Sequence, residues 1–380
     1  MPIPSESMLL ETLRFLHSHP ETAFEEHETT AHLRAALEEA GIAVHPCGLD
    51  TGLIAQIDGA LPGPTVGLRA DIDALPIQED SGLACSSVIP GRMHACGHDF
   101  HAAAVLGAAL MLHAQRDTLP GRVMVIFQPA EEVDGGGRIV ARHPLLHECK
   151  CFLAGHTYPG FPAGTVGVRE GAVMAAVDRF RLVIRGVGVH AAHPHAGIDP
   201  IVVQAALVQS LQTIVSRTMS PFSHSLVSVT HVEAGNTWNV IPSTAMLEGT
   251  VRTLDPADRE RVEKQFCQIV SGVGAAYGTP IDIEWTRGSP AVINDPALCE
   301  LARSTALAQG LTVDRQDDTL GGEDFSQYLM DKPGVFVRIG TGGQRPAHHP
   351  GFTVDPAALY PAARYFAALA RACLEAPLSL

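Results

Sequence analysis

The segment Thr65–Asp71 reads TVGLRAD, and it is followed by DFHAAAVLGAALMLHA at Asp99–Ala114 and by RVMVIF at Arg122–Phe127. A β-rich run, an apolar helical pattern and a second β-rich run predict two parallel strands joined by a helical crossover. A short helix near Arg138 and a further strand at Cys151–Ala154 continue the alternation. Strands that alternate with helices are typical of a mostly parallel sheet covered on both faces, so the fold class is α/β.

The remaining elements of this α/β domain lie at the two ends of the chain. Apolar residues at helical spacing predict two opening helices, a β-rich run at Gly52–Ile57 predicts a strand after them, and a helix, a strand and a last helix are expected near the C-terminus. The ranges of the helices and of the last strand are Ser7–His17, His27–Glu39, Pro296–Gln309, Gly334–Ile339 and Pro356–Leu374.

The order of elements changes in the middle of the chain. The patterns there predict strand, helix, strand, strand, helix and strand, which is the βαββαβ order of a ferredoxin-like α+β sandwich. We therefore predict a discontinuous α/β domain of residues 1–178 and 294–380, with a smaller domain of residues 179–293 inserted into it. The predicted elements of the inserted domain are Arg179–Arg185, Ile198–Arg217, Ser225–Ala234, Thr244–Thr253, Pro256–Tyr277 and Ile281–Thr286.

Composition excludes several classes of partner. Acidic residues outnumber basic ones by 41 to 26, for a formal net charge of −15, and such a surface repels nucleic acid. The longest apolar run, Ala102–Leu112, is shorter than the roughly 18 residues of a membrane-spanning helix. The N-terminal residues MPIPSESMLL lack a signal-peptide pattern, and the 8 cysteines are too sparse for a disulfide framework. We expect a cytoplasmic protein with reduced thiols and no membrane partner.

Polar side chains gather where the predicted strands of the α/β domain end. In open α/β sheets, the crevice beyond the carboxyl ends of the strands is where ligands bind. A thiol, imidazoles and carboxylates arriving together there are the ligand set of a borderline-soft divalent ion, zinc first. The residues concerned are Asp71, Asp73, Cys96, His98, Glu131, Glu132, His156, His348 and His349.

The adjacent carboxylates of Glu131 and Glu132 are the most informative pair. Two neighbouring carboxylates repel each other, which raises the pKa of one of them unless one binds a cation. The other is then free to act as a general base. A solvated acidic turn ahead of the glycines at 135–137 is the alternative reading of the pair alone.

The motifs of the chain, taken in order, resemble those of the M20 metallopeptidases. The most similar branch contains hippurate hydrolase, N-acyl-amino-acid deacylases and plant auxin-conjugate hydrolases, and the resemblance covers nearly the whole chain. The motifs are RADIDALPI (69–77), MHACGHDFH (93–101), FQPAEEVDGGG (127–137), HAAHPHAGIDP (190–200), AGNTWNVIP (234–242), GTVRT (249–253) and GGEDFS (321–326).

The resemblance implies a two-metal centre in the α/β domain. Asp73 matches an aspartate that orients a metal ligand, and Glu131 matches the catalytic base. His348 is preferred to His349 because family members place the ligand two residues before a proline, here Pro350. The implied ligands are Cys96, His98, Glu132, His156 and His348, with Cys96 as the bridge.

The inserted domain resembles the lid and dimerisation domain of the family. His190 matches the lid histidine that reaches into the partner's active site and polarises the scissile carbonyl. Asn239 and Arg252 match lid residues that hold the substrate carboxylate. The expected partner protein is therefore a second copy of the chain, giving a homodimer.

These features predict a metal-dependent amidohydrolase that cleaves N-acyl amino acids into a carboxylic acid and a free amino acid. The ligand set accepts two divalent ions, Zn first, with Mn, Co or Ni as alternatives. A dipeptidase or an N-acetyl-diaminopimelate deacetylase is the alternative enzyme, and a non-catalytic metal- or carboxylate-binding protein is a remote one. Phe100, Val187 and Val189 depart from the family pattern, which leaves the acyl pocket undefined. No role is assigned to Asp71, His94, His101, His193 and His195.

Overall fold

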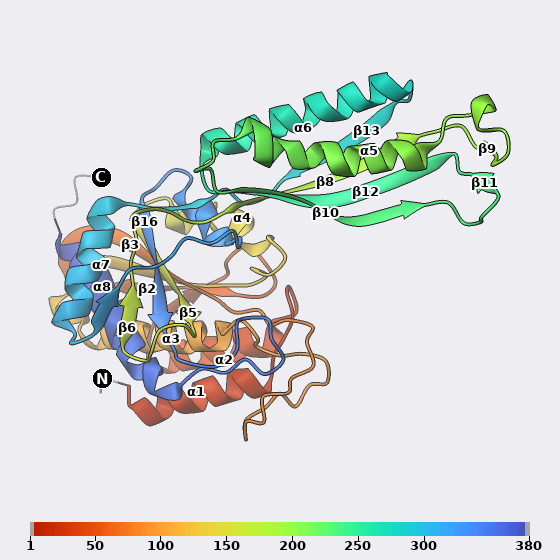
Figure 1. Cartoon of the computed structure of the whole chain (residues 1–380). Helices are drawn as coiled ribbons and strands as arrows, with labels where there is room; N and C mark the ends of the chain where they lie inside the picture. Colours follow the sequence, from red (N-terminus) through yellow and green to blue (C-terminus); the bar gives the residue numbers. More distant parts are fainter. Residues whose placement is uncertain (1–3, 377–380) are drawn as a thin grey trace. The chain divides into compact units, whose positions relative to one another are not determined.

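The computed structural model describes residues 4–376, which form two compact units (Figure 1). Unit 2 contains Met174–Ala291 and Asp318–Glu323, and unit 1 contains the other described residues. The sequence prediction placed both boundaries a few residues later and assigned Asp318–Glu323 to the α/β domain. The structure differs because the amide of Ala175 donates to the carbonyl of Gly321 at 2.8 Å, which ties this segment to unit 2.

Unit 1 is built, within the described residues, on a sheet of 8 strands in the order β1-β2-β4-β3-β5-β16-β6-β15. The central strand β3 is parallel to β4 and β5, and β5 is parallel to β16. The strands are β1 (Ala43–His45), β2 (Leu53–Asp58), β3 (Leu61–Asp71), β4 (Pro120–Gln128), β5 (Cys149–Tyr158), β6 (Thr165–Gly167), β15 (Thr312–Asp314) and β16 (Gly334–Gly340).

The sheet is mixed, with 4 of the 7 neighbouring pairs among its described strands parallel, and chain connectivity explains why β2 is antiparallel to its neighbour β4. Only Gly59 and Ala60 separate β2 from β3. A parallel pair needs a crossover of about a dozen residues, so β2 must run opposite to β3. Since β4 lies between them and is parallel to β3, β2 and β4 are antiparallel.

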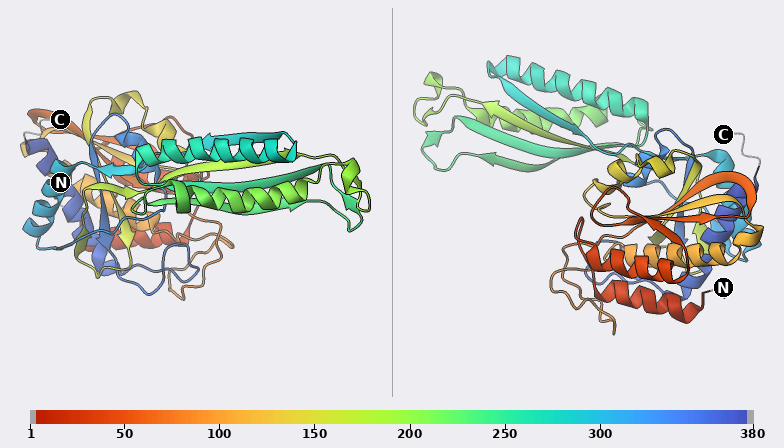
Figure 2. Two further views of the ribbon diagram at one scale, coloured as in Figure 1. Left: turned by 45° about the horizontal axis from the view of Figure 1, so that its top comes forward. Right: turned by 180° about the vertical axis from the view of Figure 1, so that it is seen from behind.

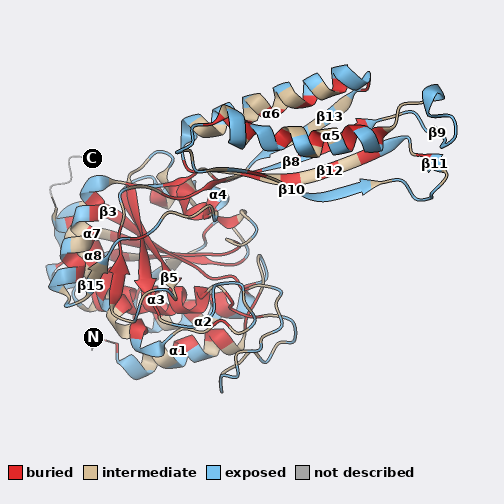
Figure 3. Ribbon diagram, in the orientation of Figure 1, coloured by how far each residue is buried: buried red, intermediate tan, exposed pale blue. Residues whose placement is uncertain are grey.

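Long helices cover one face of this sheet, and short helical segments lie on the other. Phe152 of β5 packs against Tyr328 of the 3₁₀ helix η5 (Asp324–Leu329), whereas a Cβ at Gly155 would meet Phe366 of α8. Positions three apart in a strand point to opposite faces. Helix α8 shares its face with α1, α3 and α7, and the short α4 lies beside η5. The central strands are buried along most of their length (Figure 3). The helices are α1 (Glu6–Ser18), α2 (His27–Glu39), α3 (His98–Ala114), α4 (Gly136–Val140), α7 (Pro296–Ala308) and α8 (Leu359–Glu375).

Unit 2 has the predicted βαββαβ order. Its sheet has the strand order β10-β12-β8-β13 with every pair antiparallel, which is the ferredoxin-like arrangement. Helices α5 and α6 lie side by side on one face (Figure 2), and Phe180, Leu207 and Phe266 are part of the core beneath them. The elements are β8 (Ala176–Arg185), α5 (Pro200–Thr213), β10 (Ser225–Ala234), β12 (Thr244–Thr253), α6 (Pro256–Tyr277) and β13 (Ile281–Arg287).

Three helices begin at an Asp-Pro pair; α6 and α7 start where predicted, and α5 starts two residues after the predicted Ile198. Asp199, Asp255 and Asp295 each accept a hydrogen bond from a backbone amide of the first turn, and the following proline needs no partner there. Gly278 ends α6 in the left-handed conformation at φ 65°. Between residues 4 and 376, no helix has both the length and the apolar character needed to span a membrane.

Candidate metal centre

The side chains predicted to bind metal come from separate segments of unit 1. Cys96 lies in the loop before α3, and His98 is the first residue of that helix, which begins one residue earlier than predicted. Glu132 lies in the turn after β4, and His348 lies in the loop after β16. His156 is inside β5 rather than after it, because the strand continues to Tyr158.

The ligand atoms of these residues form two groups that share one sulfur. Cys96, His98 and His156 make up one group, and Cys96, Glu132 and His348 make up the other; within each group all ligand atoms lie within 4.8 Å of one another. Sγ of Cys96 is 3.3 Å from Nε2 of His156, and Nε2 of His348 is 3.3 Å from Oε1 of Glu132. The structure therefore brings all the predicted ligands together, with Cys96 at the position expected of a bridge.

The polar atoms of these groups fit a cation. Nε2 of His98 and Oε1 of Glu132 are buried without a hydrogen bond, although Oε1 of Glu132 is in ion-pair range of Nε2 of His348 at 3.3 Å. Buried polar atoms without hydrogen bonds are costly, and a bound cation would satisfy both. Burial opposes charge on His98, yet Asp71 and Asp73 raise the pKa of its imidazole well above the ordinary value. Burial also raises the pKa of Cys96 to about 12, so a thiolate at this position requires a compensating positive charge.

Asp73 connects two of the predicted ligands. Its Oδ1 lies 3.3 Å from Nδ1 of His98, and its Oδ2 accepts a hydrogen bond from the amide of Glu132 at 3.0 Å. A carboxylate at Nδ1 favours the tautomer in which Nε2 carries the lone pair. Asp73 thus contacts both His98 and Glu132, and its orienting role stays a prediction.

The turn that carries Glu131 and Glu132 is held by a carboxylate that the sequence analysis did not single out. Glu26 is fully buried, and its Oε1 accepts the amide of Ala130 at 2.8 Å. Ala130 itself has φ 57°, an uncommon backbone angle for a residue with a side chain. Glu131 lies with His98 and Glu132 in a third group of atoms within 4.8 Å. No local signal marks Glu26, because its contact spans 104 residues.

The two adjacent histidines after β16 have different surroundings. The amide of His348 donates to the carbonyl of Ala95 at 2.7 Å, which places the residue next to Cys96. In contrast, Nδ1 of His349 accepts a hydrogen bond from the amide of Gly351 at 2.9 Å. The structure therefore groups His348, and not His349, with Cys96 and Glu132.

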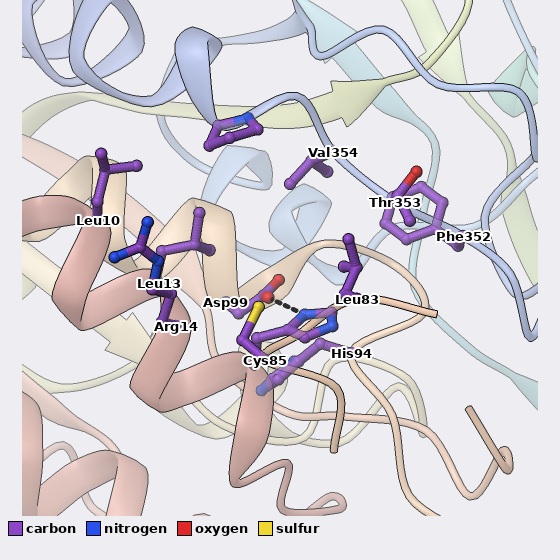
Figure 4. Close-up of a pocket in the computed structure, with 12 residues that line it drawn as sticks. Leu10, Leu13, Arg14, Leu83, Cys85, His94, Asp99, Phe352, Thr353 and Val354 are labelled. Carbon is purple, nitrogen blue, oxygen red and sulfur yellow. Dashed lines mark hydrogen bonds and ion pairs between the residues drawn. The ribbon is translucent and has the colours of Figure 1, made fainter. Parts of the chain in front are cut away.

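A small cavity lies beside the segment that carries the ligands. Figure 4 shows His94 and Asp99 at its wall together with apolar side chains that include Leu13 and Phe352, and its volume is about 100 Å³. His94 is buried here without a hydrogen-bond partner. Phe100, which the sequence analysis linked to the acyl pocket, is instead 1% exposed within the core of unit 1.

The predicted substrate-binding residues of unit 2 lie near opposite ends of strand β12, with His190 in a separate pair of short strands. His190 ends the short strand β9 (Val189–His190), which pairs with β11 (Val240–Ile241), and the amide of Ala191 donates to the carbonyl of Asn239. Arg252 is near the far end of β12, 8 residues beyond its start at Thr244. At about 3.3 Å per residue, this stretch of strand alone spans about 26 Å. His193 and His195 are exposed beside His190.

Comparison with known proteins identifies relatives with the same architecture. The family model for peptidase family M20/M25/M40 matches residues 67–372. N-acetylcysteine deacetylase of Bacillus subtilis (strain 168) is 44% identical over 368 residues, covering 97% of each chain. N-acetyl-L-cysteine deacetylase of the same organism is 43% identical over 370 residues, covering 97% of this chain and 89% of the relative. A solved dinuclear metal-binding M20 peptidase of Bacillus subtilis has a TM-score of 0.88 and 41% identity, covering 97% of this chain and 98% of that one.

The family match includes every segment that contributes a ligand atom to the two groups around Cys96. The fold of the whole chain also agrees with that of the solved dinuclear relative. The chain therefore belongs to peptidase family M20/M25/M40, and it is an amidohydrolase of that family with a site for two divalent metal ions.

Proposed function

We propose that this chain hydrolyses the amide bond of small N-acyl amino acids, with Glu131 as the general base. The observation that carries the proposal is the position of the Glu131 carboxylate, which lies with His98 and Glu132 in one group of atoms within 4.8 Å. Glu132 is at the same time grouped with Cys96 and His348. Of the two adjacent glutamates, Glu131 lies next to the proposed ligands but belongs to neither of the two groups that contain Cys96.

The proposed ligands divide the site into two halves. Cys96, His98 and His156 would hold one ion, and Cys96, Glu132 and His348 would hold the other, with the Cys96 sulfur common to both groups. Zinc is the first choice for a thiolate, imidazole and carboxylate set, and Mn, Co and Ni are the alternatives. Two divalent ions bound there supply Lewis acidity to the amide carbonyl and to the attacking water.

Glu131 carries the proton through the reaction. Its carboxylate accepts a proton from water as the water oxygen forms a bond to the acyl carbon. The same proton then passes to the amide nitrogen as the C–N bond breaks. One water is consumed, and a carboxylic acid and an amino acid leave.

The geometry of unit 2 supports a homodimer in which each lid serves two sites. His190 is proposed to polarise the scissile carbonyl, and Arg252 and Asn239 are proposed to bind the substrate carboxylate. Asn239 lies beside His190, so it would come from the same copy as His190, and Arg252 from the other copy. The length of β12 separates His190 from Arg252 by more than the length of a small N-acyl amino acid. Hence the two residues that act on one substrate come from different copies of the chain. We assign this enzyme to the cytoplasm.

A turnover assay on a panel of substrates tests the proposal. The panel contains N-acetylcysteine, hippurate, N-acetyl-diaminopimelate and a dipeptide, each offered to protein as purified, after chelation and after addition of Zn²⁺, Mn²⁺, Co²⁺ or Ni²⁺. We expect hydrolysis of N-acyl amino acids that is lost on chelation and restored by a metal ion, and that falls about 10²- to 10⁴-fold in Glu131→Gln. Preferential cleavage of the dipeptide, or full turnover without metal, would overturn it.

A further inference from the structure

A chain of buried hydrogen bonds lies behind the group formed by Cys96, His98 and His156. Oδ1 of Asp71 is 2.6 Å from Nδ1 of His101, and Nε2 of His101 accepts the backbone amide of Thr157 at 2.8 Å. Asp71, His101 and Thr157 are all buried, with at most 3% of each residue exposed. These contacts join the end of β3, the first turn of α3 and the strand β5.

The backbone amide determines the tautomer of His101. A peptide N–H only donates, so Nε2 of His101 must carry the lone pair, and the proton of the neutral ring is therefore on Nδ1, facing Asp71. Both ring nitrogens are thus occupied by hydrogen bonds. His101 consequently has no lone pair left for a metal ion, although it lies within 4.8 Å of His98 and Asp71.

Thr157 contacts both segments that hold ligands of this group. Its carbonyl lies 2.9 Å from Nδ1 of His156, which turns the Nε2 lone pair of that ring toward Sγ of Cys96. Its hydroxyl donates to the carbonyl of Cys96 at 3.0 Å. Its side chain also abuts Gly97, where a Cβ would come within 2.7 Å of Oγ1 and where φ is 85°. Thr157 therefore determines how Cys96 and His156 face each other.

The far end of the chain is anchored by a buried arginine. Oδ2 of Asp71 accepts a hydrogen bond from Arg69 at 2.7 Å, and Arg69 also donates to Asp324 at 2.8 Å and to Gln128 at 3.0 Å. Arg69, Asp71 and Asp324 are each 1% exposed. A doubly paired guanidinium in such surroundings holds the Asp71 carboxylate in one orientation.

We propose that Asp71, His101 and Thr157 are positioning residues that set the metal affinity of the half-site formed by Cys96, His98 and His156. Within the described residues, these three residues form hydrogen bonds to one another and to Arg69, Cys96 and His156, through their side chains or through the backbone of Thr157. None of these hydrogen bonds goes to Glu132 or His348. We call the hydrogen-bonded chain of Asp71, His101 and Thr157 the relay. Its loss should therefore weaken binding of the ion held by Cys96, His98 and His156 more than binding of the other ion. This inference rests on the ligand assignment of the proposed function.

Cobalt binding to the full chain tests the relay without any substrate. Metal-free wild type titrated with Co²⁺ should bind two ions, with a thiolate-to-cobalt absorption band. Thr157→Val keeps the side-chain shape but removes the hydroxyl, and His101→Leu removes both ring contacts. Loss of a side chain that hydrogen-bonds to a metal ligand costs about 10- to 100-fold in metal affinity. In both variants we expect a loss of this size for one ion, the one assigned to the half-site of Cys96, His98 and His156, while the other ion retains an affinity close to that in wild type.

Conservative and unrelated variants serve as matched controls. Thr157→Ser retains the hydroxyl and should restore binding of both ions. His17→Gln breaks a buried pair in which Nδ1 of His17 lies 2.7 Å from Oδ2 of Asp99, a residue of the helix that also carries His98 and His101. This variant should lower the unfolding midpoint without changing the affinity for either Co²⁺ ion. Equal loss of affinity in Thr157→Val and His17→Gln, or no rescue by Thr157→Ser, would overturn the relay.

The same titration separates this inference from the proposed function. If wild type binds two Co²⁺ ions and the variants behave as expected, the relay stands even when no N-acyl amino acid is hydrolysed. If Co²⁺ binding in Thr157→Val and His101→Leu matches wild type while hydrolysis proceeds, the relay is wrong and the proposed function stands.

Discussion

At the residue scale, the candidate metal centre contains two pairs of identical residues that are adjacent in sequence but have different surroundings. Glu131 and Glu132 are adjacent, yet the backbone amide of Glu132 is tied to Asp73 and its carboxylate lies beside His348. His348 and His349 differ in the same way, since only His348 is grouped with Cys96. Chemical identity alone does not distinguish the members of either pair; the position of each side chain does.

Exchange of each glutamate for glutamine separates the two proposed roles. Glu131→Gln should bind two metal ions normally and lose about 10²- to 10⁴-fold in kcat, because it removes only the base. Glu132→Gln should lose metal as well as activity. Elemental analysis together with kcat for both variants checks this, and the opposite pattern of metal loss would exchange the two assignments.

At the scale of the elements, helix α1 is joined to α3 through a buried charged cluster. His17 near the end of α1 lies 2.7 Å from Asp99 in the first turn of α3 and 3.1 Å from Glu79 in the loop after β3. Burial disfavours the charge on His17, but the hydrogen bonds to both carboxylates outweigh it and raise its pKa to about 10. The docking of α1 therefore depends on protonation.

The stabilisation by His17 should depend on pH in one direction. Because its pKa is about 10 in the folded chain and about 6.5 when unfolded, the contribution is complete below pH 6.5 and is lost as pH rises through about 10. Urea unfolding of wild type and His17→Gln between pH 6 and 10.5 measures it. The difference in unfolding free energy should shrink across this range, and a constant difference would contradict the charged pair.

Two glycines in different elements should respond to alanine in opposite ways. At Gly136, the first residue of α4, a Cβ would lie 1.7 Å from the carbonyl oxygen of Pro129, so Gly136→Ala must distort the turn that carries Glu131 and Glu132. At Gly272 in α6 nothing lies within 4 Å, so Gly272→Ala should stabilise the chain by about 0.5–1 kcal/mol.

Thermal unfolding and metal content check both glycine variants together. Gly136→Ala should lower the unfolding midpoint and reduce retained metal, while Gly272→Ala should raise the midpoint and leave the metal content unchanged. Normal metal content in Gly136→Ala would show that the turn adapts without moving Glu132.

At the scale of the whole molecule, the proposed division of labour between copies makes a quantitative prediction. His190→Ala and Glu131→Gln homodimers should each be nearly inactive. After random subunit exchange about half of the dimers are mixed, and one of the two sites in each mixed dimer combines an intact centre with an intact His190. Activity should therefore recover to about one quarter of the wild-type site count.

Native mass spectrometry must show that exchange has occurred before this result is interpreted. Mixing each variant with itself is the control, and it should give no recovery. Absence of recovery in fully exchanged mixed dimers would place His190 in its own subunit's site or outside catalysis.

The sequence by itself determined which elements form and which chemical groups the centre contains. Helices and strands follow from local periodicity; α6, for example, was predicted over Pro256–Tyr277, which are the bounds that the structure shows. The predicted succession of strands and helices in unit 2 is itself the βαββαβ motif, so no tertiary contact was needed to recognise it. The motifs around Cys96, Glu131 and His348 named the candidate residues, because covalent order keeps each short motif together.

Only the tertiary structure decided how these groups face one another. The sharing of Cys96 by two ligand groups, the place of Asp318–Glu323 in unit 2 and the distance between His190 and Arg252 all depend on contacts between remote segments. His101 is the clearest example, because its hydrogen bond to the amide of Thr157 joins residues 56 positions apart and no periodic pattern in the sequence predicts it. Such contacts form only when buried polar groups must find partners inside the folded core, and no local pattern encodes which partners they find.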